Sequence, residues 1–166
     1  MNPEEFRLPR YEQIPDVGLY LEQVVRYINS RLEPLGGQRL TASMVSNYVK
    51  QKLIHAPQKK LYTAEHLALL LFIAVVKSVV PLEGLRMLFE IQGECCSLQA
   101  AYDFFCDEFE SMLGASFGAV PVREDTDGSR REEKELLRNA IAAVVGKIRL
   151  DRNLEEYRKQ REEATR

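Results

Sequence analysis

The sequence predicts an all-α, mainly helical protein that carries one small two-stranded wing. Three observations predict this fold class. Apolar residues recur at helical spacing in several separate stretches, and a short basic stretch broken by Pro57 lies between two of them. The 166 residues are 45% hydrophobic, which is enough to bury a core. That length fits one domain with a substantial appendage.

Two helices are predicted before the wing. Asp16 can cap the first, which Pro34 stops. Its apolar positions are Leu21, Val24, Val25, Ile28 and Leu32. Thr41 can cap a short second helix whose inner side carries Val45, Tyr48 and Val49. Its outer side presents Ser43, Ser46, Asn47 and Lys50, so one face is polar.

The wing and the helices after it follow from the remaining pattern. Residues 53–62 are too short and too broken for a helix and fit a two-stranded wing. Thr63 caps a helix whose run 67–76 is apolar on every side, which predicts a central, buried helix. A helix that begins near Pro81 and ends at Gly93 follows, and then a helix over 97–113, a linker over 114–128 and a long helix over 130–163. We expect the last dozen residues to be solvated and frayed.

The charge distribution separates one segment from the rest of the chain. The formal net charge is −2, which argues against a nucleic-acid ligand. Residues 38–62, however, contain five Lys or Arg and no Asp or Glu. Residues 63–120 contain two basic and eight acidic residues. A compact basic segment of this kind is the electrostatic footprint expected for a phosphate backbone, although a merely solvated stretch has the same composition.

The order of the predicted elements is that of a winged helix-turn-helix, whose second helix enters the major groove of DNA while the wing flanks it. We expect this domain over residues 1–92 and a C-terminal helical region over 93–166. Asn and Lys can hydrogen-bond base edges, Ser can bond bases or phosphates, and lysines at a wing tip can neutralise phosphates. The candidate DNA-binding residues are Arg39, Ser43, Ser46, Asn47, Lys50, Lys59, Lys60 and Tyr62.

The same stretch resembles the DNA-binding domain of MerR-type transcriptional regulators. The similarity covers about residues 38–92 and is carried by Met44-Val45-Ser46-Asn47-Tyr48-Val49-Lys50-Gln51-Lys52-Leu53-Ile54, Pro57, Lys60-Leu61-Tyr62-Thr63-Ala64-Glu65-His66-Leu67 and Leu82-Glu83-Gly84-Leu85. A wider stretch, from Leu8-Pro9-Arg10-Tyr11 through Asn47-Tyr48-Val49-Lys50, is similar to an uncharacterised bacterial family, domain of unknown function 1836. These resemblances imply a MerR-like fold and a regulatory role.

Carried over by position, the MerR resemblance assigns Tyr48 to the recognition helix, Tyr62 to the tyrosine after the wing and Lys60 to a phosphate contact. Two positions depart from the pattern. Ser46 replaces a recognition-helix arginine, and Lys52 replaces a glycine that ends the helix in a left-handed turn. The turn over residues 34–40 is also longer than is usual for this motif.

Other functions have weaker support. His55, His66 and the three cysteines lack the spacing of a zinc site, so we expect no metal and no cofactor. Cys95 and Cys96 can be sensor thiols or packed small side chains, and the absence of nearby basic residues favours packing. The acids near residues 103–110 have no nucleophile or histidine beside them, so we expect no enzyme. The aromatic residues Tyr102, Phe104, Phe105 and Phe109 fit a core better than an effector pocket, although a small-molecule effector stays open.

The start of the chain has no signal-peptide pattern and its longest apolar run is too short to span a membrane, which favours a cytoplasmic protein. We expect a homodimer that binds double-stranded DNA. The long terminal helix would pair with its counterpart, assisted by the apolar helix at 67–76. The alternative is a protein-interaction module that kept the winged fold and binds a partner through the acidic helix at 103–110 or through the charged tail.

Overall fold

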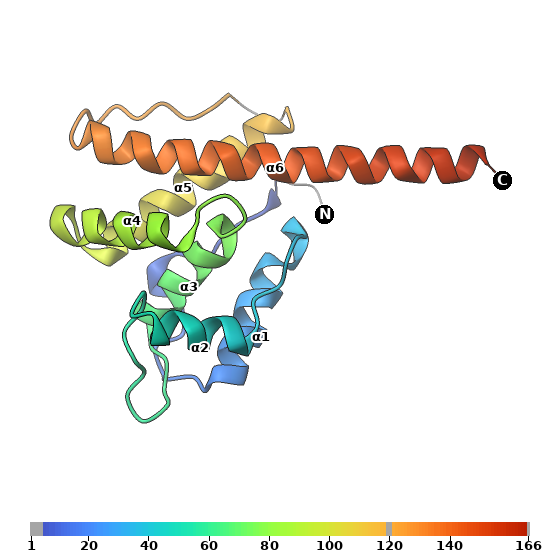
Figure 1. The fold of residues 1–166 in the computed structure, drawn as a ribbon. Coiled ribbons are helices and arrows are strands. Elements are labelled where there is room, and N and C mark those ends of the chain that lie inside the picture. The colour runs from blue at the N-terminus through green and yellow to red at the C-terminus, as the bar shows by residue number, and fades with distance from the viewer. Residues whose placement is uncertain (1–4, 119–120, 166) are drawn as a thin grey trace.

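The computed structural model of the chain describes residues 5–118 and 121–165. Within these ranges the protein is mainly helical, as predicted (Figure 1). Its elements are α1 (Leu21–Leu32), α2 (Ala42–Lys50), α3 (Ala64–Val76), α4 (Leu82–Cys95), α5 (Leu98–Ser116) and α6 (Arg131–Ala164), with single 3-10 turns at Tyr11–Gln13 and Glu33–Leu35. No described helix is long and apolar enough to cross a membrane.

Helix α3 forms the centre of the molecule. Eleven of its 13 residues are buried, and it packs against α1, α5 and α6. Its apolar sides are therefore covered within the chain, which confirms the predicted central helix. The same burial leaves α3 without an exposed apolar face for a second copy of the protein. The predicted contribution of α3 to a dimer contact therefore has no exposed surface in the structure.

The start of α1 differs from the prediction. The helix begins at Leu21, and Asp16 lies in an extended segment before it. The Asp16 carboxylate accepts a hydrogen bond from the Ala64 backbone N–H at 3.0 Å, in the first turn of α3. Asp16 therefore caps the central helix α3, which is distant in sequence, and not α1, which follows it in the chain.

The predicted two-stranded wing is a tight turn instead. In the described chain, residues 51–62 contain only single antiparallel bridges, Gln58 with Leu61 and Tyr62 with Leu19. The Leu19 and Tyr62 backbones exchange two hydrogen bonds, of 2.9 and 2.8 Å. The return half of the loop thus pairs with the segment before α1. In the outgoing half, Pro57 has no N–H with which to extend a ladder to the return half.

The later helices are longer than predicted. Helix α4 continues past Gly93 to Cys95. The Ser97 hydroxyl accepts a hydrogen bond from the Ala100 N–H at 3.2 Å and caps α5, which continues to Ser116. The connection to α6 therefore begins after residue 116 and not at 114.

Helix α6 packs along α5 and then projects beyond the body of the molecule (Figure 1). Its packed side is formed by Leu137, Ile141, Val144, Val145 and Ile148. The last dozen described residues are exposed, as predicted, but they are helical as far as Ala164.

Candidate nucleic-acid interface

The outward face of α2 is polar and exposed. Ser43, Ser46, Asn47 and Lys50 are all exposed, whereas Val45 and Tyr48 on the other side are 0% and 9% exposed. The inner residues hold α2 against the core through the hydrophobic effect, and the outer residues make no contribution to that packing. The structure therefore gives α2 the two faces that its sequence predicts.

The beginning of α2 is fixed by a buried asparagine. The Asn29 amide of α1 donates to the Leu40 carbonyl and accepts from the Leu40 N–H, both at 2.8 Å. Next to it, the Thr41 hydroxyl caps the helix by accepting from the Met44 N–H at 3.2 Å. Satisfying both backbone groups of one residue with one side chain sets the position at which the helix starts. Arg39 lies just before this point and is exposed.

The end of α2 is a Schellman motif with Lys52 in the left-handed conformation, φ 55°. The Leu53 N–H bonds the Tyr48 carbonyl at 2.9 Å and the Lys52 N–H bonds the Val49 carbonyl at 3.0 Å. Arg86 of α4 donates to the Gln51 carbonyl at 2.9 Å. The position where a glycine was expected does take the glycine-type conformation, although its residue is lysine.

Lys59 and Lys60 form the tip of the loop after α2. Their φ angles are 50° and 64°, and the Leu61 N–H bonds the Gln58 carbonyl at 2.9 Å. This is the geometry of a type I′ turn, which strongly favours Asn and Gly. We call residues Gln58–Leu61 the basic turn. In Figure 1 its loop projects from the body beside the end of α2.

The described residues include four non-glycine positions with positive φ, namely Lys52, Lys59, Lys60 and Arg130. Three of the four lie in the acid-free segment over residues 38–62. A non-glycine residue in this region costs roughly 1 kcal/mol, and such strain is concentrated at functional sites. Lysines therefore occupy positions at which glycine or asparagine would be less strained.

The base of the loop is held by His66. Its buried ring accepts a hydrogen bond from the Thr63 N–H through Nδ1, at 3.1 Å, and its Nε2 lies 3.1 Å from the His55 carbonyl. Burial and the neighbouring His55 ring, 4.0 Å away between centroids, lower the pKa of His66. The neutral ring is therefore the form that the fold requires, with Nε2 as donor.

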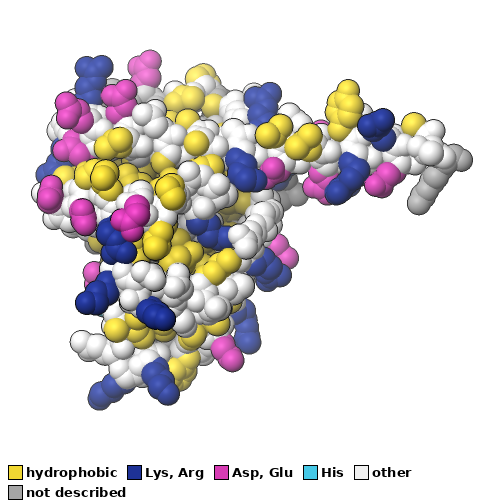
Figure 2. All heavy atoms as spheres, viewed as in Figure 1, with side chains coloured by type: hydrophobic (Ala, Val, Ile, Leu, Met, Phe, Trp, Pro, Cys, Tyr) yellow, Lys and Arg dark blue, Asp and Glu magenta, His cyan; other side chains and the backbone are white. Residues whose placement is uncertain are grey.

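The structure brings together seven of the eight predicted site residues as exposed side chains of α2, its flanks and the basic turn. Tyr62 is the exception. It is only 5% exposed, and its ring packs edge-on against His66 at 5.2 Å, so its ring belongs to the core and not to the surface. Figure 2 shows Lys and Arg side chains around the end of the molecule that α2 and the basic turn form, with acidic side chains gathered mainly elsewhere.

Sequence reasoning did not find the residues that position this surface. Asn29 and Arg86 hold the two ends of α2, and His66 and Asp16 hold the base of the loop. The signal for His66 was present, because a residue that can accept a hydrogen bond three positions after Thr63 forms a capping box. The other three act between distant segments, which no local pattern reveals.

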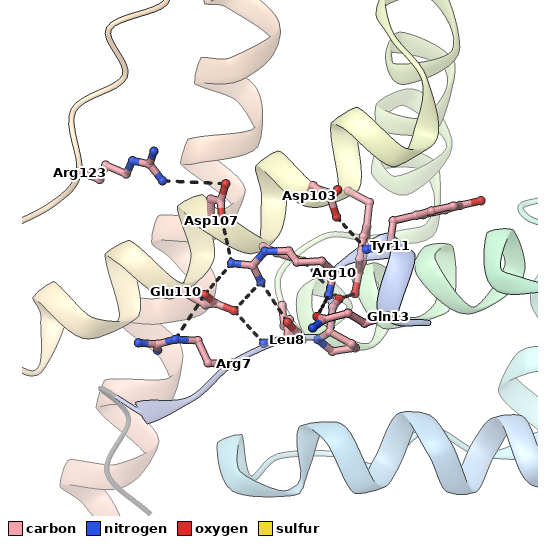
Figure 3. A network of polar contacts seen from close by, with 12 residues as sticks. Arg7, Leu8, Arg10, Tyr11, Gln13, Asp103, Asp107, Glu110 and Arg123 are labelled. Carbon is pink, nitrogen blue, oxygen red and sulfur yellow. Dashed lines mark hydrogen bonds and ion pairs between the residues drawn. The ribbon is translucent and has the colours of Figure 1, made fainter. Parts of the chain in front are cut away.

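The acids of α5 are occupied by the N-terminal segment (Figure 3). Arg10 makes two parallel bonds to Glu110, of 2.8 and 2.9 Å, and one of 2.8 Å to Asp107. The Tyr11 N–H donates to Asp103 at 2.8 Å. On the opposite side, buried Glu108 accepts from Arg138 at 2.9 Å. The acidic helix proposed as a partner-binding surface is thus used to fasten the chain to itself.

The cysteines and aromatic residues lie apart from this surface. The sulfur atoms of Cys95 and Cys96 are 3.0 Å apart at the end of α4, and Cys106 is buried. Burial raises the pKa of Cys96 to about 11, which keeps the thiol protonated at neutral pH. Tyr102, Phe105 and Phe109 are core residues, whereas Phe104 is half-buried. Within the part of the chain that the structure describes, no group of three or more His, Cys, Asp or Glu could hold a metal ion.

Comparison with known proteins identifies a family. No curated protein and no solved structure matches the chain. The sequence model of a family described as a domain of unknown function, DUF1836, matches residues 9–105. This match covers more than half of the chain and includes α1 to α4, the basic turn and the first part of α5. The protein therefore belongs to the DUF1836 family.

Proposed function

We propose that the protein is a homodimeric transcriptional regulator that binds duplex DNA through the outward face of α2 and the basic turn, in the manner of a MerR-like winged helix-turn-helix. The observation that carries this proposal is the exposed surface of residues 38–62. It presents Arg39, the polar face of α2, Lys59 and Lys60, and the segment contains no carboxylate.

The chemistry of this surface supports both parts of DNA recognition. Asn47 and Lys50 on α2 can hydrogen-bond base edges in the major groove. Lys59 and Lys60 can neutralise phosphates beside it, which supplies affinity without sequence preference. The strained backbone of the basic turn also supports a functional role, because the two lysines are exposed and make no core contact that would offset the strain.

The projecting part of α6 supports a homodimer. An outer stripe runs along this helix outside its packed side, and it consists of Leu136, Ala140, Ala143, Leu150, Leu154 and Tyr157. Its four large side chains are between 49% and 70% exposed. Figure 2 shows hydrophobic side chains along the projecting helix. Leu150, Leu154 and Tyr157 in the projecting part recur at spacings of four and three, which is typical of a coiled-coil seam.

The charges near the outer stripe favour an antiparallel pair. Asp151 and Arg158 flank the stripe in the projecting part of the helix. In a parallel pair each would face its own copy, which like charges disfavour. In an antiparallel pair centred near Leu154, Asp151 of one chain would lie opposite Arg158 of the other. This arrangement depends on the distal half of α6 and needs no surface of α3.

Equilibrium binding to a fluorescent duplex of mixed sequence, followed by anisotropy at low salt, tests the proposed function. The double variant Lys59→Ala/Lys60→Ala should bind more weakly than the wild-type protein. The double variant Arg131→Ala/Arg149→Ala removes the same charge from α6 and should bind nearly as well. A folded wild-type protein that shows no binding would overturn the proposal.

A protein partner in place of DNA gives a different result in the same experiment. Asp103, Asp107 and Glu110 already bind the N-terminal segment, so the charged tail is the surface that this alternative retains. A partner that binds through the tail would be lost with changes in α6 and unaffected by the loss of Lys59 and Lys60.

A further inference from the structure

A cavity of about 360 Å³ lies between α3, α4, α5 and the beginning of α6, away from the proposed DNA surface. Its walls are mainly apolar, and its volume is in the range of sites for small organic molecules. Figure 2 shows hydrophobic side chains reaching the surface between α4 and the start of α6. The proposed function uses none of these residues.

The cavity walls favour a flat aromatic occupant. Four phenylalanines line it, namely Phe72, Phe89, Phe104 and Phe105. Phe72 meets Phe105 edge-on at 4.9 Å and lies 5.8 Å from Phe89 between ring centroids. Rings presented at different angles can contact both the face and the edge of another aromatic ring.

The cavity rim carries one cation, Arg130, whose guanidinium lies near the Cys95 thiol and interacts with Glu133 without forming a close ion pair. Lys134 lies 2.9 Å from Asp125 and 3.5 Å from Asp127, so its charge is compensated. The ion pairs found among the described residues do not include Arg130, although Glu133 also lines the rim one turn further along α6.

The backbone at Arg130 favours the same kind of ligand group. Arg130 is the N-cap of α6 in the left-handed conformation, φ 51°, and no side chain caps the first turn. The uncapped N–H groups and the helix dipole add to the positive potential at this end of the cavity.

We propose that this cavity binds a small aromatic anion, with its rings among the four phenylalanines and its anionic group at Arg130 and the start of α6. The proposal goes beyond DNA binding and does not depend on it. The ligand class follows from the aromatic walls together with Arg130, the rim cation that forms no close ion pair.

Two fluorescent probes with the same rings test the proposal. 1-Anilinonaphthalene-8-sulfonate carries an anionic group, and N-phenyl-1-naphthylamine lacks it. The sulfonate should bind the wild-type protein with one site per chain and more tightly than the neutral probe. Arg130→Gln should weaken sulfonate binding roughly tenfold and leave the neutral probe unchanged. Arg131→Gln removes the same charge from the next residue, which does not line the cavity, and should change neither.

Filling the cavity provides a second variant. Ala101 lines the wall, so Ala101→Leu should weaken both probes, whereas Ala142→Leu on the exposed side of α6 should weaken neither. Equal affinity of the wild-type protein for the two probes would overturn the anionic part of the proposal. Unchanged binding by Ala101→Leu would overturn the site.

A measurement on the wild-type protein covers the case in which Ala101→Leu does not fold. Cys95 and Cys96 line the cavity, whereas Cys106 is buried elsewhere. Bound sulfonate should slow alkylation of the first two cysteines by iodoacetamide, resolved by mass spectrometry, and leave Cys106 unlabelled. Alkylation at the same rate with and without the probe would contradict the proposed location.

Discussion

Arg10 and Glu110, which are 100 positions apart in the chain, form a bidentate ion pair with N–O distances of 2.8 and 2.9 Å. Glu110 also accepts the Leu8 N–H at 2.8 Å, so one carboxylate holds both a side chain and the backbone of the N-terminal segment. Phe6 adds an edge-on contact with Phe109 at 6.0 Å. The segment before α1 is thus an integral part of the fold.

Loss of the Arg10 guanidinium should destabilise the protein. Arg10→Met leaves the Glu110 side chain, which is 10% exposed, without its main partner. We expect the free energy of unfolding in urea to fall by about 2 kcal/mol, because a largely buried carboxylate loses charge-assisted hydrogen bonds. Arg123→Met is the control, since Arg123 is 73% exposed and 4.0 Å from Asp107. Equal stability of the two variants would contradict this role of Arg10.

Relief of strain in the basic turn should separate stability from DNA binding. Lys59→Asn/Lys60→Gly installs the residues that a type I′ turn favours, and it should raise the free energy of unfolding by about 1 kcal/mol. The same variant should bind duplex DNA more weakly, because it removes two cations. Urea unfolding and anisotropy on one preparation measure both effects. A gain in stability with unchanged DNA affinity would show that the basic turn does not contact the DNA.

Protonation of His66 should destabilise the fold at mildly acidic pH. Its pKa is lowered in the folded protein by burial and by His55, so the unfolded chain binds the proton more readily. The stabilisation is therefore complete above pH 6.5, the ordinary histidine value, and is lost as the pH falls below it. His66→Gln retains an acceptor for the Thr63 N–H and a donor for the His55 carbonyl.

Urea unfolding at several pH values checks this prediction by difference. The wild-type protein should lose more stability than His66→Gln between pH 7.5 and 5, since carboxylates titrate equally in both. Parallel pH curves for the two proteins would show that His66 does not carry the effect.

A charge in the outer stripe of α6 should prevent dimer formation. Leu154 is 60% exposed and lies at the middle of the proposed antiparallel contact. Leu154→Glu would put two carboxylates near each other and remove apolar area, so sedimentation should show a monomer where the wild-type protein is a dimer. Lys159→Glu places the same residue on the other side of the helix and should leave the dimer intact. A wild-type monomer at all concentrations would contradict the homodimer itself.

Much of the fold follows from short-range patterns in the sequence. The spacing of Val45 and Tyr48 against Ser46 and Asn47 predicted the two faces of α2, and the apolar run 67–76 predicted the buried α3. Helix ends were less accurate, because Gly93 is tolerated within α4 when the packing of the helix continues past it.

The remaining features depend on contacts between distant residues. Asp16 was expected at the start of α1 but caps α3, 48 residues away, because the extended segment pairs with Tyr62. The acids of α5 were considered as a surface for a protein partner, and no local pattern identifies Arg10 as the group that binds them. The exposed site residues could be predicted because they need only an amphipathic helix and a charged turn. The groups that position them could not.

The salt dependence of binding to duplex DNA is the most direct test of the central claim that α2 and the basic turn form a DNA surface. The logarithm of the association constant should fall linearly with the logarithm of salt concentration for the wild-type protein. The slope of Lys59→Ala/Lys60→Ala should be smaller by about 2 for each protomer that contacts the duplex, with unchanged sequence preference. An identical slope for this variant and the wild-type protein would show that the basic turn does not meet the phosphates and would contradict the account.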